Sequence, residues 1–282
     1  MLAALAATLL FAAPAPASVG PPTLCFQLDI GEATSLPWGA GAFGADPDYD
    51  LQRLPQDTYD ILLRSDDPFV HAETLRRAVV YLTGAGKTRA KPSAEVGEAL
   101  LAALFEELEF DRAVHDAAGK AACEEQKAAC EEAKACEKPA PGAAGVRHWI
   151  LPVEPAWGGR VCQAKGRPAD LCFFDVGYLR AVLREAGAAR REDGATELRV
   201  MLALDAADPR LQLLAGLGLV DHPDQALRTE GWKLLDSAAA VAEDSPARAT
   251  VRRNLLGTAG RILGAKDHDE LVDRIRQRLA PG

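Results

Sequence analysis

Three of the six cysteines lie on one charged stretch, residues 119–142. The unit Cys-Glu-Glu-X-Lys-Ala begins at Cys123 and again at Cys130, and a shortened copy begins at Cys136. Strong helix formers and charge pairs at helical spacing predict a solvated helix here. Its rise would separate neighbouring cysteines by roughly 9–10 Å, beyond the ~7 Å Cα limit for a disulfide.

The three helix cysteines therefore need partners elsewhere in the chain if all are oxidised. The remaining cysteines are Cys25, Cys162 and Cys172. We expect structural disulfides that staple the charged helix to the N-terminal arm and to the central segment, unless Cys162 and Cys172 pair with each other. A zinc site or a set of redox-active thiols is the alternative chemistry for these residues.

The N-terminus predicts export, which agrees with disulfide chemistry. Residues 1–17 form an apolar run followed by small residues and prolines, which is typical of a secretory signal peptide. The mature protein would be periplasmic or extracellular, where an even number of cysteines usually forms disulfides. The run carries no Lys or Arg, so an uncleaved membrane anchor is the alternative.

Two further patterns resemble ligand loops but depart from them. Asp46, Asp48 and Asp50 alternate, and Asp57 stands at the twelfth position of a calcium loop. The sixth position lacks the required glycine, so the pattern is a weak calcium candidate and favours a solvated acidic loop. Residues 78–88 resemble a strand entering a phosphate-binding loop, but Tyr81 stands where its first glycine belongs, which favours a helix ended by glycine.

The chain lacks the common catalytic signatures. The five histidines are scattered without metal-binding spacing, and no Gly-X-Ser-X-Gly, His-Glu-X-X-His or Cys-X-X-Cys motif occurs. Trp149 and Trp157 would line a sugar-binding face or, more simply, fill a core. The sequence indicates no cofactor, and the net charge of −9 argues against nucleic acid as a partner.

Composition and periodicity predict a mainly α protein, an irregular array of stacked helix pairs with one small β-hairpin segment, stapled by disulfides. Aromatic residues make up 6% of the chain, whereas Ala and Leu are abundant. We expect an irregular arm over 18–57 with a strand-like piece at 24–30, a helical part over 58–118, a β segment over 143–174 and a helical array over 175–282. Residues 58–282 would form one domain.

Helix start and stop signals are clear at several positions. Asp57 is expected to cap a short helix, Asp67-Pro68 to open the next, and Gly84 to end it. Ser93, Asp208-Pro209, Ser245-Pro246 and Asp267 open further helices, each with an apolar stripe.

Two stretches resemble the second helix of HEAT-type repeats. They are Asp66-Asp67-Pro68-Phe69-Val70-His71-Ala72-Glu73-Thr74-Leu75, and Asp221-His222-Pro223 followed by Leu227 to Leu235. The resemblance implies stacked helix pairs that form a surface for another protein, with no active site. The sequence thus favours a non-enzymatic, exported, protein-binding module. The alternatives are an exported hydrolase or carbohydrate-binding protein with a site between the β segment and the C-terminal helices, and a cysteine-based redox or metal protein.

Overall fold

The computed structural model describes residues 22–41, 43–85, 91–109, 112, 168–188, 193–240 and 246–280. These ranges are mainly helical and contain no β-strand, which confirms the mainly α class. The buried core forms one cluster that runs from Leu24 to Ile275. Among the described helices, none combines the length and the apolar character that crossing a membrane requires.

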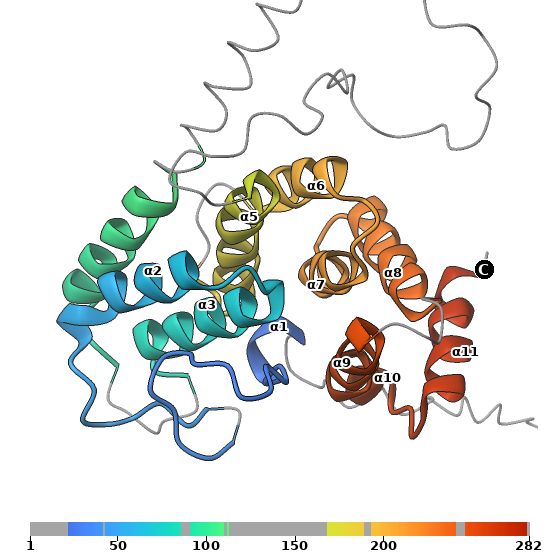
Figure 1. Cartoon of the computed structure of the whole chain (residues 1–282), viewed down its shortest axis with the longest axis horizontal. Helices are drawn as coiled ribbons and strands as arrows, with labels where there is room; N and C mark the ends of the chain where they lie inside the picture. Colours follow the sequence, from blue (N-terminus) through green and yellow to red (C-terminus); the bar gives the residue numbers. More distant parts are fainter. Residues whose placement is uncertain are drawn as a thin grey trace, which may run out of the picture.

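Helix α7 (Pro209–Leu219) lies inside the helical array (Figure 1). It contacts α5 (Ala169–Glu185), α8 (Gln225–Ala239), α9 (Pro246–Leu255) and, from the N-terminal half, α3 (Pro68–Thr83). Its buried residues are apolar or glycine, from Leu211 to Leu219. A helix that is apolar on most of its surface is one that the fold must enclose.

The N-terminal arm is largely irregular, as predicted. Helix α1 (Pro22–Cys25) opens it, a single antiparallel bridge joins Trp38 to Ala45, and the short 3₁₀ turn η1 (Leu51–Arg53) ends it. The predicted strand-like piece at 24–30 was wrong, because its start belongs to α1 and its remainder pairs with no other strand in the described residues.

Helices α2 (Leu54–Arg64) and α3 follow the arm. Asp57 lies inside the first turn of α2, three residues after its start, so the prediction that Asp57 caps this helix was wrong. The α3 prediction was right: Asp67 accepts a hydrogen bond from Phe69 N, Pro68 occupies the first position, and Gly84 ends the helix with a φ of 64°. That left-handed conformation is one that glycine adopts at little cost.

A further helix spans residues 94–109. Ser93 Oγ accepts a hydrogen bond from Val96 N, as a capping serine does. Leu100, Leu104 and Leu108 are buried, which confirms the predicted apolar stripe except at Val96, which is 37% exposed.

Helix α5 corrects the predicted β segment over 143–174. Residues 169–174 belong to α5, including Asp170 and Cys172, which were expected in the β segment. The rest of the predicted β segment, residues 143–167, lies outside the described residues. The charged cysteine stretch, 119–142, lies outside them as well.

The C-terminal array continues with α6 (Ala195–Leu204), α7, α8 and α9, the π-helical turn η3 (Leu256–Gly260), α10 (Arg261–Leu263) and α11 (His268–Leu279). Asp208 and Asp267 cap α7 and α11 as predicted. Helices α7 and α8 approach closely at Gly216 and Gly231, where a methyl group on Gly231 would lie 3.0 Å from Gly216 O.

Candidate functional site

Helix α3 carries charged residues inside the protein. Glu73, Arg76 and Arg77 are 0%, 0% and 8% exposed, and we call them the α3 charge cluster. The apolar residues Leu75, Ala78, Val79 and Leu82 recur at helical spacing, which predicts one buried face, but α3 is buried on all sides. Burying charge is costly unless each group is paired, so the partners of the cluster decide its role.

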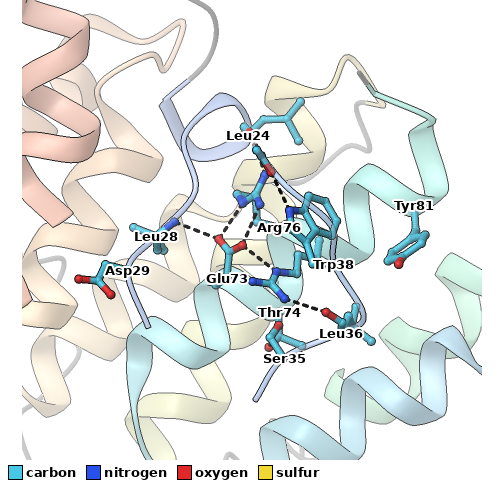
Figure 2. A network of polar contacts seen from close by, with 12 residues as sticks. Leu24, Leu28, Asp29, Ser35, Leu36, Trp38, Glu73, Thr74, Arg76 and Tyr81 are labelled. Carbon is cyan, nitrogen blue, oxygen red and sulfur yellow. Dashed lines mark hydrogen bonds and ion pairs between the residues drawn. The ribbon is translucent and has the colours of Figure 1, made fainter. Parts of the chain in front are cut away.

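The Glu73 carboxylate accepts four hydrogen bonds. Oε2 accepts from Arg76 Nε at 2.8 Å and from Leu28 N of the arm at 3.1 Å. Oε1 accepts from Arg76 Nη2 and Arg77 Nε, each at 2.8 Å. Figure 2 shows Glu73 and Arg76 reaching from α3 to the arm that crosses it. Four donors match the number of lone-pair sites that a carboxylate offers.

The two arginines bind the main chain of the arm. Arg76 Nη1 donates to Leu24 O at 3.2 Å, and Arg77 Nη1 donates to Leu36 O at 2.7 Å. Both guanidinium groups face the ring of Trp38, with Cζ 5.0 and 5.2 Å from its centroid. The cluster therefore binds peptide groups and an aromatic ring of the arm.

Two more side chains of α3 continue this pattern. Tyr81 Oη donates to Pro37 O and accepts from Asp46 N. Thr74 Oγ1 and Ser35 Oγ lie 2.8 Å apart (Figure 2). From the sequence, Cys25, Trp38 and Phe43 are the residues that we expect to order the arm, by contact with an apolar surface. Trp38 and Phe43 do pack against the core, but polar side chains of α3 hold the main chain of the arm.

A buried His–Asp pair joins α3 to α5. His71 Nδ1 lies 2.8 Å from Asp175 Oδ1, and both side chains are fully buried. His71 Nε2 lies 2.7 Å from Ser65 O, and because a carbonyl oxygen only accepts, Nε2 carries a proton. In a hydrolytic triad, a nucleophilic hydroxyl would occupy the place of this carbonyl. The pair thus has a structural role, because it joins α3 to α5.

The other described histidines are also in structural positions. His222 lies in the turn between α7 and α8. Its Nδ1 accepts from Asp224 N, and its Nε2 donates to Asp193, which precedes α6. His268 is buried at the start of α11. Among the described residues, no group of three or more His, Cys, Asp or Glu side chains is placed to hold a metal ion.

Three of the four aspartates of the calcium candidate use their carboxylates for hydrogen bonds within the protein. Asp46 Oδ1 accepts from Asp48 N, and Asp50 Oδ1 accepts from Gln52 N. Asp57 accepts from Tyr49 Oη at 2.8 Å and from Arg53 at 3.0 Å. Burial, followed by this bond to Asp57, raises the pKa of Tyr49. The structure does not bring the four carboxylates together as one group.

Two of the six cysteines lie in the described residues. Cys172 is buried in α5, Cys25 is half-buried at the end of α1, and no disulfide joins them. Burial raises the pKa of the Cys25 thiol, and the nearby charge of Glu185 raises it further. A raised pKa lowers the thiolate fraction, which disfavours Cys25 as a nucleophile. The other four cysteines, Trp149 and Trp157 lie outside the described residues.

A groove opens to solvent between α2 and the helix over 94–109, with a volume of about 560 Å³. We call it the α2 groove. Its residues from the α2 side are Gln52, Pro55 and Gln56, and those from the other helix are Glu95, Val96, Ala99, Leu100, Ala103 and Glu107. The helix contributes an apolar middle with a carboxylate at each end, because Glu95, Ala99, Ala103 and Glu107 recur every fourth residue.

Sequence reasoning did not find the α3 charge cluster. The available signal was Glu73 followed by arginines at the third and fourth positions, an ordinary pattern of exposed helices. Glu270 and Arg274 form such a pair on α11, where both side chains are partly exposed. The two patterns look alike in the sequence. The burial of their side chains in the folded chain distinguishes them.

The described residues thus hold a buried charge cluster, a buried His–Asp pair and a solvent-facing groove. The cluster and the pair bind main-chain and side-chain groups of the protein itself, whereas the groove offers a surface to an external molecule. Comparison of the chain with family models, with curated proteins and with solved structures finds no match.

Proposed function

We propose that this protein is an exported, non-enzymatic helical protein that binds a segment of another protein in the α2 groove. The observation that carries the proposal is the groove itself, with an apolar middle and a glutamate at each end. The α3 charge cluster binds the arm, and His71 binds Asp175 and Ser65, so these buried groups are paired with the protein itself. Close packing of α5 with α6 and of α7 with α8 supports the HEAT-like resemblance, which implies a binding surface.

The lining of the groove indicates the chemistry of the partner. Ala99 and Ala103 are small, so a partner's side chains can approach the helix between them, and Val96 exposes an apolar surface. Glu95 and Glu107 are twelve positions apart, which corresponds to roughly 18 Å along the helix. A partner segment with apolar residues flanked by Lys or Arg at that separation complements both features.

A charge reversal tests this proposal. The probe is a set of synthetic peptides that carry Leu or Val residues between two lysines at varied spacing, and fluorescence anisotropy measures binding. We expect binding that weakens with salt, and that falls at least tenfold in the double variant Glu95→Lys with Glu107→Lys. Peptides with glutamates in place of the lysines should then bind the variant better than they bind the wild-type protein.

The matched control reverses two other glutamates of the same helix. Glu98 and Glu106 are exposed and do not line the groove. The variant Glu98→Lys with Glu106→Lys changes net charge by the same amount and should keep most of the binding. Equal losses in both variants would show a diffuse charge effect, and an absence of binding by every peptide would reject the groove as the site.

Export and the disulfides remain parts of this proposal. The apolar N-terminus and the cysteine content support them. Mass spectrometry of the protein from its native source should find Ser18 as the first residue. Non-reduced peptide mapping should find Cys123, Cys130 and Cys136 cross-linked to cysteines outside the 119–142 stretch. Retained residues 1–17 would count against signal cleavage, and free thiols would favour redox or metal chemistry.

A further inference from the structure

A second contact of the arm differs in kind from the α3 charge cluster. Glu185 is the last residue of α5, and its Oε2 accepts from Thr23 N at 2.9 Å and from Leu24 N at 3.3 Å. These two N–H groups belong to the first turn of α1, where a helix has no partners of its own for them. One carboxyl group of α5 therefore docks the first turn of α1.

This carboxyl group has no compensating cation at bonding distance in the described residues. Its Oε1 is buried and has no hydrogen-bond partner there. The C-terminal end of a helix carries partial negative charge, which disfavours a carboxylate at this position. Glu73, by contrast, is bonded to two guanidinium groups.

The groups around Glu185 come from several elements. Arg184 of α5 favours its charged form, and Asp221 of the turn after α7 disfavours it. Cys25 of α1 and Tyr178 of α5 also face Glu185. Burial is the main cause that raises the pKa of each of these two groups. Arg76 and Glu73 of α3 act on these neighbours, with Arg76 lowering and Glu73 raising the pKa of Tyr178.

Burial dominates the balance and raises the pKa of Glu185 to about 8, although bonds from Thr23 and the charge of Arg184 lower it. The docked form thus holds a proton that the released, solvated carboxyl group loses near its ordinary pKa of about 4.3. The contact is strongest below the ordinary pKa and weakens as pH rises towards 8.

We propose that Glu185 makes the docking of α1 pH-sensitive, so that the start of the arm is held in acidic medium and released as the medium becomes alkaline. Release would expose Leu24 and Phe26, which are 6% and 8% exposed in the docked arm. The inference rests on the α1–α5 contact and does not depend on the α2 groove.

Hydrogen exchange of the full chain, read by mass spectrometry over peptides that contain residues 23–26, tests the proposal. One proton lost on release predicts that the protection factor, corrected for the intrinsic rate, falls about tenfold per pH unit between pH 5.5 and 7.5. Peptides from α7 serve as the internal reference, because global unfolding would change their protection equally.

The variant Glu185→Gln separates ionisation from hydrogen bonding. A glutamine oxygen still accepts from Thr23 N and Leu24 N but does not ionise, so protection at 23–26 should become independent of pH. A wild-type slope near zero, or an equal slope in Glu185→Gln, would overturn the proposal. If Glu185→Gln loses protection at residues 23–26 at every pH, Glu185→Asp provides a second variant that can ionise. Protection at 23–26 that does not change with pH in Glu185→Asp would also reject the proposal.

Discussion

Helices α3 and α7 are both buried, but the residues that surround them accommodate them in opposite ways. Both helices are buried, yet α3 encloses a carboxylate and two guanidinium groups, whereas the buried side chains of α7 are apolar. The neighbours of α7 are helices, and the arm that crosses α3 is irregular. The charges buried on α3 therefore face an irregular main chain that passes through the interior. Buried charge also occurs between two helices, where Arg180 of α5 donates to Glu197 of α6.

Backbone hydrogen bonding explains this difference. A helix satisfies its own N–H and C=O groups, so α8 can pack on α7 with apolar contacts and the close approach of Gly216 to Gly231. The arm has only scattered internal bonds of this kind, and Leu24 O, Leu28 N and Leu36 O bond to side chains of α3 instead. Long charged side chains on α3 supply partners that apolar residues could not.

The junction of the two regions follows the same rule. Asn254 of α9 accepts from Asp29 N at 2.6 Å and donates to Asp29 O at 3.0 Å. Asn254 is 2% exposed, and it meets the arm rather than another helix. A polar side chain again occurs where irregular main chain is buried.

The largest expected effect is at Glu73. The change Glu73→Ala leaves Arg76, Arg77 and Leu28 N without their carboxylate, and should lower the free energy of unfolding by roughly 3–5 kcal/mol. Urea denaturation measures it. Replacing Glu73, Arg76 and Arg77 together by Leu, Met and Met should still destabilise, because main-chain groups of the arm lose their partners. A neutral triple variant would refute our account of the α3 surroundings.

A smaller effect is expected from Gly231→Ala in the apolar region. The added methyl group would lie 2.8 Å from Val220 N and 2.9 Å from Leu219 C, both rigid main-chain atoms. We expect a loss of about 1–3 kcal/mol from overpacking, also read by urea denaturation. Gly257→Ala is the control, since nothing lies within 4 Å of its added methyl group. Comparable losses at both glycines would contradict the close-packing argument.

The smallest effect is expected at Arg199, which pairs with Glu230 across α6 and α8 on the surface. The pair is partly exposed, at 43% and 31% of the two side chains. Arg199→Ala should change the free energy of unfolding by about 1 kcal/mol or less, and added salt should reduce the difference. A loss as large as that of Glu73→Ala would show that burial does not separate the two kinds of charge.

Local signals in the sequence determined where many helices begin and end. Asp67-Pro68, Ser93, Asp208-Pro209 and Asp267 act on neighbouring N–H groups, and Gly84 ends α3 through its own backbone freedom. Such effects reach only a few residues along the chain, so they can be read without the fold. The failures at 24–30 and 169–174 occurred in short apolar stretches, where periodicity does not separate strand from buried helix.

The tertiary structure alone decided what the polar side chains do. Glu73 bonds to Leu28, His71 to Asp175 and Glu185 to Thr23, across 45, 104 and 162 positions of the chain. The sequence marks these residues as charged or polar but carries no local sign of their partners. Partners are set by which elements pack together, because burial turns a group that water would solvate into one that needs a bonded neighbour.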